Sequence, residues 1–560
     1  MKRYFISILF LLICIKSFST VGNKTQLIQA GHWLYNDLYT VSSEAKKSYF
    51  IDNQPLSVGE IEFYLNEVEY ETLSDAGKNL YDKVWAYLNN INDFFPNFEF
   101  RLYTNLKANP ELYYKSNPEI PFSFDYAIKD RFLTAPIIIG FADYITLQMD
   151  LFLGKNFGAA QAPDNYANLP YGVNQFELLT PRFAYGSTGL YRKDWGVNIQ
   201  VGKEGLTVGN TLLGSIIYNK TFESDFYIQI NLFTKGIKYT SDILQVSSDK
   251  YVYLHQINLR PLKNLKFGCL EGTLLNAPFE LRFLNPLTIM HGFAGWNDYR
   301  SNMTDLEWKN YNEGHFGAYL AFTLEYMPIK NLRLYGLYSQ NEILDLGYEH
   351  SDKDLSYPDS LGGQFGIEYT TPFSDCSILK NTVEASYTSP YLYIKQSPDW
   401  SFVKIRDGVY TWMGSPFGPD CFALKYQAYY QAKKDWNISF SYLFKIHGEN
   451  RSNMFTTSEL INENGKTETI YTYYPYSEYI NAQTDEERQA AVSKSRNMWM
   501  SGIREYTHQF AIKGEYQFLQ NLSAYAQIVY TFIYNNKNIF NNFAQGIELG
   551  IGCEYRVLKV

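Results

Sequence analysis

The chain has 560 residues and carries 49 Lys and Arg against 58 Asp and Glu, which gives a formal net charge of −9 at pH 7. This acidic balance and the lack of a basic stripe argue against a nucleic-acid partner. Hydrophobic residues make up 46% of the chain and aromatic residues 18%, yet the mean hydropathy is −0.30, so apolar residues are interleaved with polar ones.

The N-terminus predicts export from the cytoplasm. Lys2 and Arg3 precede an uncharged, mostly apolar run (residues 4–15), and residues 17–19 (Ser-Phe-Ser) match the small-x-small pattern that signal peptidase favours. We therefore expect residues 1–19 to be a secretory signal peptide that is cleaved. A retained anchor fits less well, because the apolar run is shorter than the roughly 20 residues of a spanning helix.

Residues 20–95 predict a small N-terminal α-helical segment. Ser57 and Glu60 form a capping box, in which the two side chains reach reciprocal backbone donors at the start of a helix. Apolar residues recur at helical spacing after this box and again from Asp75, and residues 32–39 can form another short helix. The sequence leaves open whether the segment docks beneath a barrel or within it.

From about Phe98 onward, apolar and polar residues alternate, which is the period of a strand. The alternation is clear along residues 315–326, 436–446, 522–534 and 547–557. Many segments of about ten residues separated by turn residues are the signature of a transmembrane β-barrel. Residues 96–560 therefore predict an all-β transmembrane barrel of about 16–18 antiparallel strands. A soluble array of β-sandwiches shares the composition and is the alternative.

Connection lengths give the predicted barrel two different ends. Short links at residues 261–264, 328–331 and 433–435 resemble periplasmic turns, and the stretches 296–314 and 450–504 suit extracellular loops. Thr484 and Glu487 in the last loop form another capping box, which predicts a short surface helix. A barrel of this width allows a lumen, which is either open or plugged.

No set of residues indicates catalysis. None of the seven His lies in a Gly-x-Ser-x-Gly turn or in a recognisable lipase or protease setting, and the carboxylates are scattered. Without a Cys-x-x-Cys motif or a His/Cys cluster, we expect no catalytic residue, no metal and no cofactor. Cys269 and Cys553 fall within alternating strands as apolar residues. Cys376 and Cys421 lie near loop ends, and spacing alone does not decide whether they pair.

Three stretches carry a resemblance to a known family. They are residues 201–211 (VGKEGLTVGNT) followed by 225–228 (DFYI), residues 32–35 (HWLY) followed by 55–60 (PLSVGE), and Glu271 followed by 281–287 (LRFLNPL). Together they resemble the Wzi-like capsule-assembly family of outer-membrane β-barrels. In that family a Gly-basic-x-x-x-x-x-Gly turn joins two barrel strands, a loop enters the next strand, and a Leu-Asn-Pro motif precedes a surface loop. Lys203 replaces the family's more usual Arg, and Val208 stands where the family often has Trp.

The resemblance implies a lectin-like barrel that holds surface polysaccharide on the cell without catalysis. Sugar rings stack on aromatic faces and their hydroxyls need polar partners, so aromatic and polar loop residues are the expected contacts. One predicted surface loop gathers the glycan-binding candidates Trp296, Tyr299, Arg300, Trp308 and Tyr311. The same residues can instead pack the loop or form an aromatic girdle.

The sequence thus favours an exported protein of the bacterial outer membrane. Its expected partners are outer-membrane lipid, the outer-membrane assembly machinery and surface polysaccharide. The alternative function is a porin-like channel for small solutes, which rests on barrel size alone. An enzyme has the least support.

Overall fold

The structure is a computed structural model. It describes residues 24–90, 100–120, 131–155, 166–170, 172–177, 183–286, 290, 316–342, 360–394, 398, 401–406, 409–433, 436–449, 455–461, 467–473, 482–496, 498–519 and 521–559. The predicted signal peptide, residues 1–19, lies outside the described residues.

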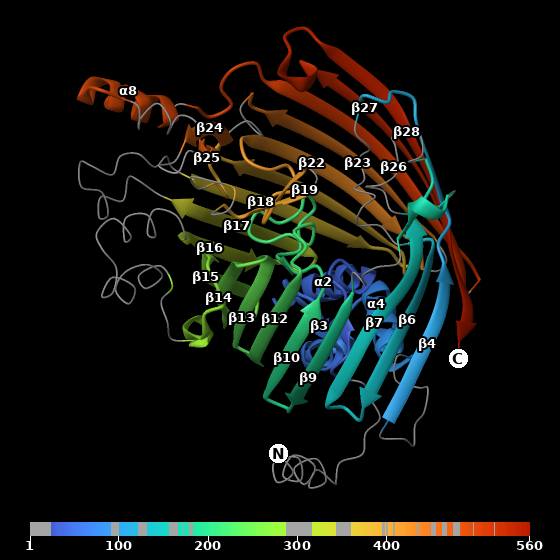
Figure 1. Ribbon diagram of the computed structural model, residues 1–560. Coiled ribbons are helices and arrows are strands. Elements are labelled where there is room, and N and C mark those ends of the chain that lie inside the picture. The colour runs from blue at the N-terminus through green and yellow to red at the C-terminus, as the bar shows by residue number, and fades with distance from the viewer. Residues whose placement is uncertain are drawn as a thin grey trace.

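Eighteen antiparallel strands close into a barrel, as the alternating pattern predicted (Figure 1). In chain order they are β4 (Phe100–Ala108), β6 (Leu133–Phe141), β7 (Ile145–Lys155), β9 (Ala184–Tyr191), β10 (Trp195–Lys203), β12 (Phe226–Thr234), β13 (Ile237–Ser247), β14 (Lys250–Leu262), β15 (Leu265–Asn276), β16 (Phe316–Tyr326), β17 (Leu332–Glu342), β18 (Ser360–Pro372), β19 (Ile378–Thr388), β22 (Cys421–Gln431), β23 (Trp436–His447), β26 (Glu505–Leu519), β27 (Leu522–Tyr534) and β28 (Phe543–Lys559).

The ring closes where the last strand meets the first. β28 pairs with β4 from Tyr555 opposite Ala108 to Lys559 opposite Asn105. Beyond the end of β4, the short strand β5 (Glu111–Lys115) pairs with residues 548–552 of β28. The short strand β8 (Phe176–Glu177) pairs with the last two residues of β7. No edge of the sheet is left open in the ring of strands, which is the condition for spanning a bilayer with strands.

Side chains on the outer face of the barrel are apolar, and those on the inner face are mostly polar. On β16, Leu324 is 49% exposed, whereas its neighbours Thr323 and Glu325 are buried. On β23, Ile438 and Phe440 are exposed and alternate with serines. The apolar set of the predicted alternation therefore lies outside, where an outer-membrane barrel meets lipid. Among the described helices, none has the length and hydropathy needed to cross a membrane.

The N-terminal helices lie inside the barrel, next to its short turns (Figure 1). They are α2 (Trp33–Ala45), α3 (Val58–Leu65) and α4 (Asp75–Asn90). The strand β1 (Leu27–Ile28) precedes them, and the strands β2 (Asn53–Gln54) and β3 (Leu56–Ser57) and a short 3-10 turn η1 (Tyr70–Thr72) lie between them. The backbone N–H of Asn331, in the β16–β17 turn, donates to the carbonyl of Ser43. Because short turns mark the periplasmic end of such barrels, the helices occupy that end.

The two predicted capping boxes have different outcomes. At α8 (Asp485–Arg496) the box is complete: Thr484 Oγ1 accepts from the Glu487 N–H, and Glu487 accepts from the Thr484 N–H. At α3 it is half formed. Ser57 Oγ accepts from the Glu60 N–H, but the Glu60 carboxylate contacts Lys238 of the barrel wall instead of returning to Ser57. Glu60 therefore joins the helix to the wall.

Long connections occupy the end of the barrel opposite the helices. They hold the hairpins β20–β21 (Val403–Arg406 and Val409–Trp412) and β24–β25 (Phe455–Ile461 and Thr467–Tyr473), the strand β11 (Thr207–Val208), and the 3-10 turns η4 (Val173–Gln175), η5 (Leu281–Leu284) and η7 (Asn536–Asn538). Cys376 and Cys421 are both free, as are the strand residues Cys269 and Cys553, so the open question of a disulfide is answered for the described residues.

Candidate functional site

The five predicted glycan-binding residues fall in the chain between β15 and β16 and lie outside the described residues. They are Trp296, Tyr299, Arg300, Trp308 and Tyr311. The candidate site is therefore built from the described lumen and its extracellular mouth. The N-terminal helical segment and two loops, residues 204–225 and residues 389–420, fill much of that lumen.

Buried ion pairs hold the helical segment against the barrel wall. Lys238 Nζ on β13 lies 2.7 Å from Glu60 Oε1 on α3, and neither side chain is exposed. Burial raises the pKa of the Glu60 carboxyl, an effect that the nearby Lys238 opposes. Lys266 Nζ on β15 lies 2.9 Å from Asp52 Oδ1. Because isolated buried charges are costly, each of these contacts ties the helical segment to a specific strand.

Residues 204–225, which follow β10, fold into the lumen. The resemblance implied a turn between two barrel strands here. These residues do join the neighbouring strands β10 and β12, but as a long segment that enters the lumen instead of a short turn. β11 pairs with β2 of the N-terminal segment, while Ile216 and Phe222 are fully buried in the main apolar core. Gly209 has a φ of +94° at this point, a backbone conformation that favours glycine. The segment leaves the wall because its apolar side chains find a core inside the barrel.

A single carboxylate fixes the inner end of this segment. Glu384 of β19 accepts from the backbone N–H groups of Leu212 at 2.7 Å and Leu213 at 2.8 Å. It also accepts from the Tyr335 hydroxyl and from the Gln364 amide. Buried N–H groups need partners, so Glu384 substitutes for the strand pairing that residues 204–225 give up.

A second loop, residues 389–420 between β19 and β22, packs on the first. The Tyr393 N–H donates to Asn341 Oδ1 of β17 at 2.8 Å, and the Tyr393 hydroxyl donates to the Ile216 carbonyl. A Cβ on Gly414 would lie 2.2 Å from that same carbonyl, so only glycine permits this approach. The two loops form one apolar cluster with the inner face of β12–β17.

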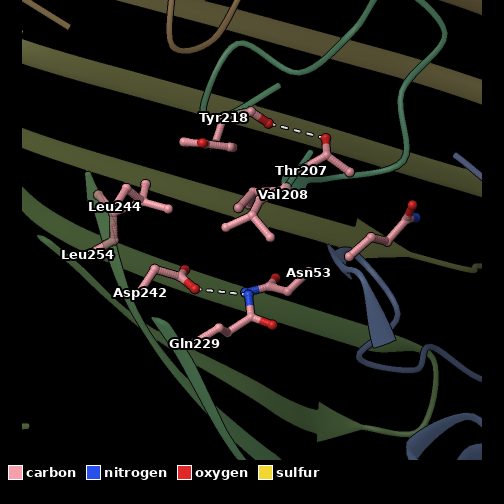
Figure 2. A pocket seen from close by; sticks show the side chains of 10 residues that line it. Asn53, Thr207, Val208, Tyr218, Gln229, Asp242, Leu244 and Leu254 are labelled. Carbon is pink, nitrogen blue, oxygen red and sulfur yellow. Dashed lines mark hydrogen bonds between the residues drawn. The ribbon is translucent and has the colours of Figure 1, made fainter. Parts of the chain in front are cut away.

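The helical segment, the inserted loop and the wall meet with little space between them (Figure 2). The cavity at this junction has a volume of about 10 Å³, close to the minimum for one water molecule. In Figure 2, Val208 faces Leu244 and Leu254, and Asn53 lies beside Gln229 and Asp242. Gln229 donates to Asp242 Oδ1 at 2.8 Å, which satisfies part of the polar wall.

The lumen is filled unevenly around its circumference. Inward-facing side chains on β22, β23 and β26 are half-buried, in contrast to those on β12–β17. On β26, the side chains of Lys513 and Glu515 are 39% and 41% exposed and form an ion pair at 2.5 Å. Lys513 Nζ lies 5.1 Å from the ring centre of Tyr525 on β27. This side of the lumen therefore presents polar and aromatic groups that water can reach.

The β20–β21 hairpin adds aromatic rings at the extracellular mouth. Tyr410 stacks on Trp412 with ring centres 6.0 Å apart and an interplanar angle of 18°. Lys404 Nζ lies 2.7 Å from Asp225 Oδ1, which fixes the hairpin to the start of β12. Sequence reasoning missed this hairpin. The alternation of Tyr410 and Trp412 was the available signal.

One titratable group at this mouth has a strongly shifted pKa. Burial raises the pKa of the Asp420 carboxyl to about 6, and the Met500 N–H donates to its Oδ1 at 2.8 Å. Perturbed groups mark functional sites, but Asp420 also has a structural task, because it joins the β19–β22 loop to the loop before β26. Among the described residues, no three His, Cys, Asp or Glu side chains come together in a way that could hold a metal ion.

Comparison with known proteins gives a likeness in structure and none in sequence. No family model matches the chain, and no curated protein matches it. The Escherichia coli outer-membrane protein Wzi, described as involved in Group 1 capsule assembly and as a carbohydrate-binding β-barrel, superposes with a TM-score of 0.54 at 12% identity, over 94% of this chain and 98% of that one.

Two channels match less well. Pseudomonas aeruginosa OprD has a TM-score of 0.35 at 8% identity, over 82% of this chain and 96% of its own. The Acinetobacter baumannii channel DcaP has a TM-score of 0.33 at 9% identity, over 83% of this chain and 99% of its own. The chain therefore has the fold of outer-membrane β-barrels, and in particular that of Wzi.

Proposed function

We propose that the protein binds surface polysaccharide at the outer face of the bacterial outer membrane and holds it there without catalysis. The observation that carries the proposal is the extent of the match to Wzi, which is described as a carbohydrate-binding β-barrel. The match covers 94% of this chain, so the unmatched part is shorter than the N-terminal helical segment. Most of the matched length is barrel, and at least part of the helical segment is matched as well. The likeness thus involves the lumen-filling helices as well as the strands, and not barrel closure alone.

Binding is assigned to the extracellular mouth. Aromatic faces stack on sugar rings, and charged or amide groups pair with sugar hydroxyls. The described mouth supplies the partly exposed ring of Tyr410, which is backed by the buried Trp412, for stacking and the Lys404–Asp225 pair for hydroxyl contacts. The predicted residues Trp296 and Trp308 lie in the chain between β15 and β16, and the strand ends that they connect are at the same end of the barrel.

The test is retention of surface polysaccharide by cells that carry the double variant Trp296→Ala/Trp308→Ala. Loss of two stacking residues should reduce retained polysaccharide roughly ten-fold, at about 0.5–1.5 kcal/mol for each ring. The matched control is Trp195→Ala/Trp436→Ala, which removes two exposed rings next to the short turns at the opposite end. Both variants must remain heat-modifiable, which shows a folded barrel. Equal retention in the two variants would reject the assignment to this loop.

A channel for small solutes is the second candidate. It is favoured by the half-buried inward side chains on β22, β23 and β26, because polar groups that water reaches can line a conduit. Single-channel conductance of the purified protein in a planar bilayer tests it. Steady large openings would make the channel the main function. Silence from a demonstrably folded barrel would leave polysaccharide binding.

A further inference from the structure

A groove with a volume of about 710 Å³ opens at the periplasmic end of the barrel. It lies between helix α3 and the turns that follow β9, β12 and β14. Its size is within the roughly 300–1,000 Å³ of small-ligand pockets. No residue of the two loops that fill the lumen from the extracellular end lines this groove.

The groove is basic in a chain that is acidic overall. The chain has a net charge of −9, yet the groove is lined by seven cations and only the carboxylates of Glu62 and Glu67. The cations are Lys24, Lys47, Arg192, Lys193, Lys235, Arg260 and Lys263. A concentration of one sign of charge in a concave site raises the local concentration of ions of the opposite sign.

Only part of this positive charge is neutralised by the protein. Arg260 lies 2.8 Å from Glu67, Lys47 lies 2.8 Å from Glu69, and Lys235 lies 3.5 Å from Asp194. Lys24 lies 4.0 Å from Glu62. Arg192, Lys193 and Lys263 form no ion pair with any carboxylate in the described part of the chain. Three cations of the groove are therefore available to an anionic ligand.

The groove opens inside the rim of the barrel, away from lipid. Tyr191 on β9 belongs to the inward-facing set that includes the buried Tyr185 and Ser187. Arg260 on β14 belongs to the inward set of Gln256 and Asn258, and it donates to the Ser48 carbonyl of the helical segment. A phospholipid whose acyl chains lie in the bilayer would place its headgroup outside this rim, so a soluble ligand fits better.

The groove also contains an acceptor without a donor. Oε1 of Glu67 is buried and has no hydrogen-bond partner among the described residues, although Oε2 contacts Arg260. Such an atom is costly unless a donor reaches it. A sugar hydroxyl can supply that donor, whereas an ionised phosphate or carboxylate offers only acceptors. The ring of Tyr191 adds an aromatic face to the same wall.

We propose that this groove binds a soluble acidic oligosaccharide from the periplasm, with its carboxylates on Arg192, Lys193 and Lys263 and a hydroxyl on Glu67. This is a second binding site, on the opposite side of the membrane from the outer mouth. It does not require that the outer mouth binds polysaccharide.

The test is calorimetric titration of the purified full-length barrel with tetragalacturonate at about 25 mM salt, where surface charges are weakly screened. Lys193→Gln/Lys263→Gln should weaken binding roughly ten-fold, since two partly exposed ion pairs contribute up to about that factor. The matched control, Lys46→Gln/Lys433→Gln, removes two exposed lysines that do not line the groove and should bind as the unmodified protein does. Binding should also weaken at about 200 mM salt.

Equal affinities of the two double variants would overturn the proposal. Tighter binding of tetraglutamate than of tetragalacturonate would also overturn it and would indicate an acidic peptide. So would binding to phosphatidylglycerol nanodiscs without binding to tetragalacturonate, which would indicate a lipid headgroup. Because the probe is soluble and the variants lie on the periplasmic side, failure here leaves the surface-retention result unaffected.

Discussion

The helical segment and the inserted loop enter the lumen from opposite ends and are held there by different interactions. The helices contact the wall through buried charges, such as Lys238 with Glu60. Residues 204–225 bury an apolar cluster and place their free N–H groups on Glu384. A helix satisfies its own backbone and needs only side-chain partners, whereas an irregular loop must also find partners for its backbone. Polar side chains on the inner face of the barrel serve as both side-chain partners and backbone partners.

The largest expected effect is on the charge-held helices. In Lys238→Met, Glu60 stays buried without its cation, which should weaken docking of the helical segment by about 3–5 kcal/mol. Hydrogen exchange of the α3 amides should therefore speed up, while the barrel strands stay protected. The double variant Lys238→Met/Glu60→Met removes both charges and should recover most of the protection. If the single variant exchanges as slowly as the unmodified protein, the pair does not hold the helix.

A smaller effect is expected at the loop. Glu384→Ala leaves the buried N–H groups of Leu212 and Leu213 without their acceptor, at a cost of about 2–3 kcal/mol. Residues 204–225 should then be cleaved faster by an added protease. Glu384→Gln keeps a carbonyl acceptor and should be cleaved at an intermediate rate. Identical cleavage of all three proteins would show that the apolar cluster alone fixes the loop.

The smallest effect is a pH dependence confined to the helices. Burial, together with Lys107, Arg556 and Lys83, lowers the pKa of His32 to about 3. At a pH below the ordinary histidine pKa of about 6.5, His32 is therefore protonated in the undocked state and neutral in the docked state. Docking is fully favourable at pH 7 and weakens as pH falls, by up to about 1.4 kcal/mol per pH unit.

The measurement is exchange protection of the α2 amides at pH 7 and at about pH 5.5, corrected for intrinsic rates. His32 also caps α2 by accepting from the Leu34 N–H. His32→Asn keeps a capping acceptor without the titration, so its protection should not change with pH. A pH response that persists in this variant would assign the effect to another group.

Much of the fold could be predicted from the sequence because it is encoded locally. The alternation of Leu324 with Thr323 and Glu325 specifies which face of β16 meets lipid, and similar patterns gave a strand count that includes the observed barrel. The caps at Ser57 and Thr484 marked helix starts for the same reason, since a cap involves residues only a few positions apart.

Other features depended on contacts between distant residues. Glu60 was expected to return to its own helix start, and instead it pairs with Lys238, which lies far along the chain. Residues 201–211 looked like a wall turn, and only the apolar core inside the barrel shows why residues 204–225 turn inward. The basic groove gathers residues from α3 and from three separate turns, so no single stretch of sequence displays it.

The amino-acid pattern alone predicts a barrel of β-strands with an apolar outer face, because lipid imposes a strict period of two on every strand, and it predicts an N-terminal helical segment. Contacts between distant parts of the chain set where the helices and loops lie and which part of the lumen they fill. Inward-facing positions are mostly polar where they meet water or the helical segment, and apolar where β12–β17 meet the inserted loops. Whether a part of the lumen is filled depends on whether a segment of the chain supplies partners for its wall. Glu60 is such a partner for Lys238, and the backbone N–H of Leu212 is one for Glu384.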